Sequence, residues 1–89
     1  MYAIIAYDIS IERLNEVRKY LKRYLNWTQN SLFEGELTNA EIEEIKIKIK
    51  DLVDIDKDHI VIYITRSLDL IDRKSIGKPK LDASNIEID

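Results

Sequence analysis

The chain begins with Met1-Tyr-Ala-Ile-Ile-Ala-Tyr-Asp-Ile-Ser10, and this stretch decides the fold. A short apolar run, rich in isoleucine and tyrosine and followed directly by a helical pattern, is typical of a strand buried on both faces. Asp8 stands where this strand meets the loop before the helix. Folds often present functional side chains at the edge of a rigid sheet, but Asp and Ser are also common just before helices. The residues alone therefore leave two interpretations of Asp8, a capping or turn residue and a functional carboxylate.

Length and composition narrow the class of protein. The sequence has 89 residues, no cysteine and a formal net charge of −3. This predicts one small domain without disulfides, of a size that association often stabilises further. Without an overall basic excess, a polyanion would have to bind a local patch. No apolar run approaches transmembrane length and no signal-peptide pattern opens the chain, so we expect a cytoplasmic protein with no membrane partner.

A first helix is expected from Ile11 to Leu25, because apolar residues recur at helical spacing on one face. Ser10 can cap its start and Asn26 can end it. Cations outnumber acids in this segment, which makes it locally basic within an acidic chain; they are Arg13, Arg18, Lys19, Lys22 and Arg23. Such a face fits a solvated helix surface as well as a surface that contacts phosphates.

The segment from Trp27 to Leu37 has strand propensity, with bend or bulge positions at Asn30-Ser31 and Gly35. One bent strand and two short strands around a tight turn both fit this pattern. Thr38-Asn-Ala-Glu41 is a capping box and predicts the start of a second helix. The core stripe of that helix comprises Ile42, Ile45, Ile49, Leu52 and Val53, which leaves Ile47 facing away from the core.

The last part of the chain begins with an acidic turn at residues 54–58, followed by an apolar strand from His59 to Thr65 that should lie beside the first strand. His59 is the only histidine and is expected at the surface, and the composition excludes a cysteine nucleophile and a structural zinc site within one chain. The segment from Leu68 to Ile76 is ambiguous and could form an edge strand. The tail, residues 78–89, is interpreted either as disordered or as a strand added to a sheet edge, including that of a neighbouring subunit.

The order of these elements predicts an α+β fold. Strand, helix, strand or strand pair, helix and strand give an antiparallel sheet with two helices on one face, the ferredoxin-like sandwich. We expect one domain over residues 1–77, with extra C-terminal strands contributed by residues 78–89. Because this fold hosts many unrelated functions, it does not name an activity.

Three motifs at fixed distances, in a chain of this length, are jointly specific. They are Tyr7-Asp-Ile-Ser10, the helix that carries Arg13 and Arg18 and closes with Leu21-Lys-Arg-Tyr-Leu25, and Gln29-Asn-Ser-Leu-Phe-Glu-Gly-Glu-Leu37. Together they resemble the small CRISPR-associated Cas-two family of the adaptation machinery. The resemblance continues through the strand at residues 60–65 to Ile76-Gly77 and so spans nearly the whole chain.

The resemblance implies a ferredoxin-like homodimer that joins the Cas-one integrase when new spacers are captured. In some members of the family it also implies cleavage of RNA or DNA with magnesium. Asp8 matches the metal-associated carboxylate of the family, near the two-fold axis of the dimer. Two Asp8 side chains facing each other across such an axis could hold one Mg²⁺ through oxygen and water ligands.

From this resemblance we expect two groups of site residues. The catalytic group is Asp8, which is also the metal ligand, with Tyr7, Ser31 and Phe33. The nucleic-acid-binding group is Arg13, Arg18, Lys22 and Arg23.

Three functions compete. The first is a dimeric adaptor that grips double-stranded DNA for the integrase, and the second is a magnesium-dependent endonuclease acting on RNA or DNA. The third is a non-catalytic module for ligand sensing or structure. The resemblance favours the first as the biological role and the second as the formal activity.

Overall fold

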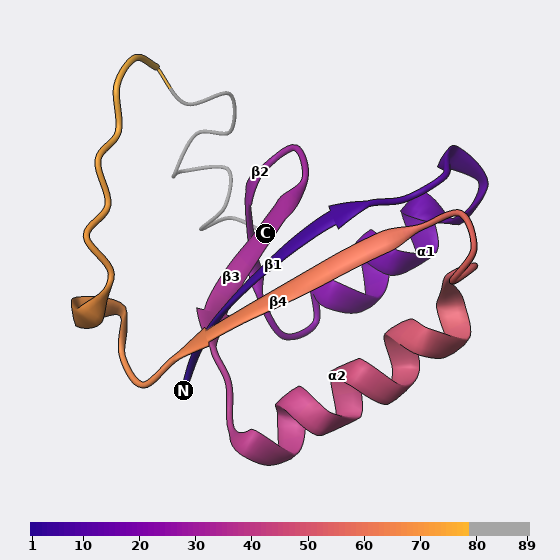
Figure 1. The fold of residues 1–89 in the computed structure, drawn as a ribbon, viewed down its shortest axis with the longest axis horizontal. Helices are drawn as coiled ribbons and strands as arrows, with labels where there is room; N and C mark the ends of the chain where they lie inside the picture. The colour runs from indigo at the N-terminus through magenta and orange to yellow at the C-terminus, as the bar shows by residue number, and fades with distance from the viewer. Residues whose placement is uncertain (79–89) are drawn as a thin grey trace.

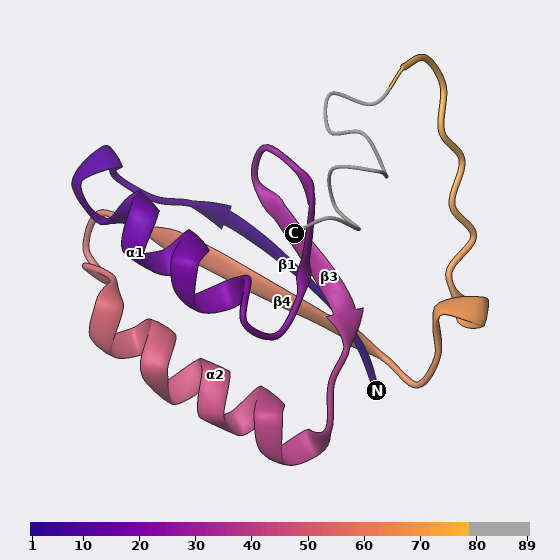
Figure 2. The ribbon, with the colours of Figure 1, turned by 180° about the vertical axis from the view of Figure 1, so that it is seen from behind.

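The computed structural model describes residues 1–78. The elements are β1 (Tyr2–Asp8), α1 (Ile11–Leu21), β2 (Asn26–Gln29), β3 (Leu32–Glu36), α2 (Asn39–Leu52), β4 (His59–Thr65) and a short 3-10 helix, η1 (Leu68–Leu70). The strands form one antiparallel sheet in the order β2-β3-β1-β4, and both helices cover the same face of it (Figures 1 and 2). The predicted α+β ferredoxin-like fold is confirmed. Within residues 1–78, no helix is long and apolar enough to cross a membrane.

Strand β1 is central, because it pairs with β3 on one side and with β4 on the other. Its alternate residues Ala3, Ile5 and Tyr7 are buried beneath the helices, while the residues between them are only half-buried. The prediction of a strand buried on both faces is therefore wrong for the single chain. Both helices pack on one side, and within residues 1–78 no second layer of helices or strands covers the opposite face, here called the open face.

Helix α1 ends at Leu21, earlier than the predicted Leu25. Residues 22–25 form a turn instead, in which the N–H of Leu25 donates to the carbonyl of Leu21 over 2.9 Å. Asn26 begins β2 and pairs with Glu34, so it does not end the helix as predicted. Leu25 is buried against Gly35, where an added Cβ would lie only 3.1 Å from a Leu25 methyl group. The helix has to stop early because the chain must turn here to bring β2 alongside β3.

The segment from Trp27 to Leu37 forms two strands, with a turn at residues 30–31 and an irregularity between Trp27 and Gln29. The predicted second helix is confirmed, including its capping box. The Thr38 side chain accepts from the backbone of Glu41 over 3.0 Å, and the Glu41 carboxylate accepts from the Thr38 N–H over 2.9 Å. Ile47 is 68% exposed, as predicted.

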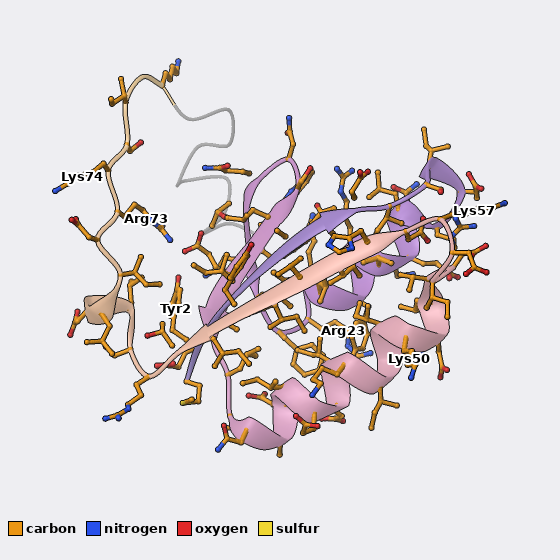
Figure 3. The ribbon with its side chains drawn as sticks, viewed as in Figure 1. Tyr2, Arg23, Lys50, Lys57, Arg73 and Lys74 are labelled. Carbon is orange, nitrogen blue, oxygen red and sulfur yellow. The ribbon has the colours of Figure 1, made fainter. Side chains whose placement is uncertain are left out.

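The segment at residues 68–76, which the sequence left ambiguous, does not form an edge strand. The segment opens with η1, whose start is capped by the Ser67 hydroxyl accepting from the N–H of Asp69, and has no regular structure from residue 71 to residue 76. Arg73 instead pairs with Glu34 of β3. Figure 3 shows where Arg73 lies in this segment. The strand predicted in the tail falls on residues 79–89, outside the described part of the chain, so it stays a prediction.

Two buried carboxylates hold segments that are distant in the sequence. Glu34, 3% exposed, accepts from the Tyr2 hydroxyl over 2.7 Å, from the Thr28 hydroxyl over 3.0 Å and from Arg73. Burial alone would raise the pKa of Glu34, but the hydrogen bonds, led by that from Arg73, outweigh it and lower the pKa. Burial and the bond to Glu34 raise the pKa of Tyr2 to about 12.

The second buried carboxylate, Asp58, lies at the other end of the sheet and has a fully buried side chain. The Arg13 guanidinium donates to it through Nε over 2.6 Å and through Nη2 over 3.1 Å. This pairing, helped by hydrogen bonds from Ser10 and Asp54, holds the pKa of Asp58 well below its usual range in spite of burial. Ser10 is the N-cap residue of α1, as predicted, but its hydroxyl donates to Asp58 and makes no cap hydrogen bond.

Acid should destabilise the protein through these two carboxylates. Because folding lowers both pKa values, their contribution to stability is complete above the unfolded-state pKa of about 4 and is lost as the pH falls below it. We expect the melting temperature to fall between about pH 4 and pH 2, and Asp58→Asn to lower it at pH 7 while flattening this acid limb. Thermal melts followed by circular dichroism measure both effects. Glu43→Gln, which changes an exposed carboxylate, is the control, and an Asp58→Asn profile parallel to that of the wild type would contradict the prediction.

Candidate functional site

Asp8 is the last residue of β1 and its side chain is exposed. Its cross-strand partner is His59, the first residue of β4. Tyr7 points to the helices, so Asp8, one residue further along the strand, lies on the open face. Within residues 1–78 the Asp8 carboxylate has no hydrogen bond or ion pair. The sheet therefore presents a free carboxylate at the C-terminal end of its central strand β1.

Tyr7 connects the end of β1 to the turn between β2 and β3. Its hydroxyl donates to the carbonyl of Asn30 over 2.8 Å, and its backbone N–H donates to the carbonyl of Ser31 over 3.1 Å. Its ring packs against Phe33 with the centroids 5.8 Å apart. Tyr7 and Phe33 thus lie in the core, on the face opposite Asp8, whereas Ser31 is exposed in the turn. Any effect of the two rings on Asp8 is exerted through the position of the backbone.

Arg18 contributes to the same contacts from α1. Its Nε donates to the Tyr7 hydroxyl over 3.2 Å, and its Nη2 donates to the carbonyl of Asn30 over 3.1 Å. The guanidinium also lies 4.6 Å from the centroid of the Trp27 ring, and the Lys22 ammonium lies 5.0 Å from that centroid. Arg18 is therefore half-buried and committed to contacts within the chain, although part of it still reaches solvent.

The four cations predicted to bind nucleic acid do not form one patch. Arg13 is bound by Asp58 at the start of α1, and Arg18 and Lys22 gather at Trp27. Arg23 lies on the side of α1 that faces α2, within 6.0 Å of the Tyr20 ring (Figure 3). Lys22 and Arg23 are exposed at the C-terminal end of α1 and are the two most accessible of the four.

The residues of one chain do not complete a metal site. Asp8 offers exposed carboxylate oxygens, which are the donors that Mg²⁺ prefers. However, no group of three or more His, Cys, Asp or Glu side chains that could hold a metal ion occurs in residues 1–78. The donor chemistry suits magnesium, but a full site requires oxygens from a second copy, from substrate or from water.

Sequence reasoning missed Asp58, which it placed in an acidic turn without a role. The structure buries the Asp58 side chain against Ser10 and Arg13. Ser10 lies in the loop that follows Asp8, two residues further along the chain. A signal was available in the sequence. A turn that directly precedes the strand paired with β1 has to lie beside the loop that leaves β1, where Arg13 begins the helix.

The comparisons with known proteins agree with this arrangement. The family model "CRISPR associated protein Cas2" matches residues 1–70. A CRISPR-associated endoribonuclease Cas2 from Methanosarcina acetivorans is 48% identical over 86 residues, which cover 97% of this chain and 99% of that protein. A second protein of this description, from Archaeoglobus fulgidus, is 50% identical over 80 residues, covering 90% of this chain and 87% of its own.

Solved structures give the same result. A crystal structure described as cas2 aligns with a TM-score of 0.83 at 42% identity and covers 93% of both chains. Cas2 from Streptococcus pyogenes aligns with a TM-score of 0.76 at 29% identity, over 86% of this chain and all of that one. The resemblance inferred from the sequence motifs is confirmed, and the chain belongs to the Cas2 family of CRISPR-associated proteins.

Proposed function

We propose that the protein is a homodimeric, magnesium-dependent endonuclease acting on RNA or DNA. The observation that carries this proposal is the free carboxylate of Asp8, which a rigid central strand presents on the open face. The relatives described as endoribonucleases support the activity. A cytoplasmic location is part of the same proposal.

In the proposed site, Asp8 from each of two copies supplies the oxygen ligands for one Mg²⁺. Magnesium at this position would polarise the phosphodiester and activate a water as the nucleophile. Tyr7 and Phe33 hold the end of β1 in place from the core, and their hydrogen bond and ring contact fix the turn that exposes Ser31. Ser31 is then available to hydrogen-bond the substrate, and the exposed part of Arg18 can offset phosphate charge.

A second role is favoured by the exposed cations at the end of α1. Lys22 and Arg23 together carry two positive charges next to aromatic rings, which suits contact with phosphates without sequence readout. We propose that this surface holds double-stranded DNA, and that the dimer does so together with the Cas-one integrase during spacer capture. This role does not require cleavage by Asp8.

The homodimer is supported by the open face of the sheet. Ile4 and Ala6 are only half-buried there, and Tyr63, the cross-strand partner of Ile4, is 59% exposed. A second copy on this face would bury that surface and bring the two Asp8 residues towards a common axis.

Removal of the Asp8 charge tests the nuclease. We expect Asp8→Asn to reduce magnesium-dependent cleavage of an RNA or DNA oligonucleotide by at least about 100-fold, because a metal ligand contributes several kcal/mol. The dimer should remain intact by light scattering. Asp69→Asn, an exposed carboxylate in η1, is the control. Cleavage that survives Asp8→Asn would indicate another site or a contaminating nuclease.

Charge reversal on α1 tests the binding surface. The double variant Lys22→Glu/Arg23→Glu should weaken binding of duplex DNA and lower the slope of log K against log salt by about 1 for each phosphate that the variant no longer neutralises. Filter binding or fluorescence anisotropy at several salt concentrations measures this slope. Lys50→Glu/Lys57→Glu makes the same change of charge on and after α2 and serves as the control (Figure 3). If both double variants weaken DNA binding equally, the effect follows net charge and the binding surface at Lys22 and Arg23 is contradicted.

Truncation tests the predicted contribution of the tail to the dimer. A chain that ends at Gly77 should dissociate to monomers at a higher protein concentration than the full chain, because residues 78–89 are expected to add a strand to the partner's sheet. Light scattering across a concentration series measures the dissociation. Unchanged dissociation would show that the dimer does not depend on these residues.

A further inference from the structure

Asp58 hydrogen-bonds the loop that follows Asp8 and directly precedes the strand residue that pairs with Asp8. One of its oxygens, Oδ1, accepts from the backbone N–H of Ser10 and from the Ser10 hydroxyl, each over 2.9 Å. The next residue after Asp58 is His59, the cross-strand partner of Asp8. Asp8 therefore belongs to a small closed ring: it is covalently linked through Ile9 to Ser10, hydrogen-bonded from there to Asp58, and paired through His59 back to itself.

The ring is anchored on every side. The other oxygen of Asp58, Oδ2, accepts from Arg13 Nε over 2.6 Å and from the backbone N–H of Asp54 over 2.9 Å. Both oxygens are thus occupied and the side chain is fully buried, so the carboxylate has no freedom to turn. Ile9, between Asp8 and Ser10, packs against the hydrophobic core. Both residues that follow Asp8 are consequently held in place.

The position of the Asp8 carboxylate depends on this anchoring. Within the described residues no hydrogen bond or ion pair orients its side chain, so the backbone alone sets its position. It is also the last residue of its strand, where the ladder to β4 ends, and on the side of β3 the last backbone hydrogen bond is that of Tyr7 to the carbonyl of Ser31. Without the contact between Ser10 and Asp58, the end of the strand would be free to fray.

We propose that Asp58 is a positioning residue for Asp8: by clamping Ser10 and the start of β4, it fixes the carboxylate where metal and substrate can use it. This inference rests on the proposed endonuclease function. Loss of a group that orients a metal ligand typically costs about 10- to 100-fold in metal affinity or activity. Asp58 touches neither metal nor substrate in this scheme, so its effect should appear in metal dependence and turnover and not in the binding of nucleic acid.

The test uses the full-length dimer and three variants. Asp58→Asn keeps the size of the side chain but removes its charge and one acceptor, and Ser10→Ala removes only the hydroxyl donor. Glu34→Gln is the matched control, because Glu34 is also a buried carboxylate paired with an arginine, but it lies on β3 away from Ser10. Ser10→Ala keeps the test decisive if Asp58→Asn folds poorly.

Cleavage of a single-stranded RNA oligonucleotide is measured against Mg²⁺ concentration, and binding of Mn²⁺ is measured by electron paramagnetic resonance. Asp58→Asn should reduce turnover and Mn²⁺ affinity by about 10- to 100-fold with the RNA KM unchanged, and Ser10→Ala should do the same to a smaller degree. Glu34→Gln should leave turnover and Mn²⁺ affinity within about twofold of the wild type, even if it lowers the melting temperature as much as Asp58→Asn does. Hydrogen exchange at the Ser10 amide should accelerate in Asp58→Asn alone.

The outcomes separate this inference from the proposed function. If the wild type binds Mn²⁺ but does not cleave, the endonuclease proposal fails, and the clamp still stands or falls on the Mn²⁺ affinities. If the wild type cleaves and Asp58→Asn and Ser10→Ala match it in turnover and Mn²⁺ affinity, the clamp is overturned. Equal reductions in Glu34→Gln would also overturn it, because the effect would then follow general stability. A wild type that binds no Mn²⁺ would overturn both.

Discussion

The pairing of β1 with both β3 and β4 is the constraint on which the rest of the structure depends. In a strand, alternate residues face opposite sides, so the register that puts Ala3, Ile5 and Tyr7 beneath the helices also puts Asp8 on the open face. A slip of one residue would bury Asp8 under the helices and expose the apolar residues. The packing that stabilises the core and the presentation of the carboxylate are therefore one geometric choice, and neither can change alone.

Much of the fold could be predicted because its signals are local. The capping box at Thr38 and the helical spacing of Ile42, Ile45 and Ile49 specify α2 within a few residues. The errors arose where a distant segment decides the outcome. The early end of α1 depends on Leu25 meeting Gly35 in β3, and residues 68–76 alternate weakly but have no partner strand within the described chain. Local propensity carries no information about either partner.

The candidate site divides in the same way. Asp8, Tyr7 and Phe33 were named as candidates through the resemblance to a known family, whereas position in the chain alone left two interpretations of Asp8. Asp58 was missed, because its burial is decided by Ser10 and Arg13, some 48 and 45 residues away, and only the predicted pairing of the first and last strands pointed to that contact. The role of Arg13 was misjudged for the same reason, because its partner Asp58 is distant in the sequence. In the sequence it is one more cation on a basic helix, but in the fold its Nε and Nη2 are committed to Asp58.

The proposed binding surface and the proposed cleavage site lie at different places on the molecule. Helix α1 starts beside the end of β1 and runs away from it, so Lys22 and Arg23 lie about 16 Å along the helix from the Asp8 loop, at 1.5 Å per residue. A duplex held by those cations need not reach the carboxylate, and a strand bound at Asp8 need not contact them. The two proposed roles therefore depend on different surface residues. If both proposed roles hold, loss of either would leave the other intact, and a variant without the Asp8 carboxylate would still bind DNA through Lys22 and Arg23.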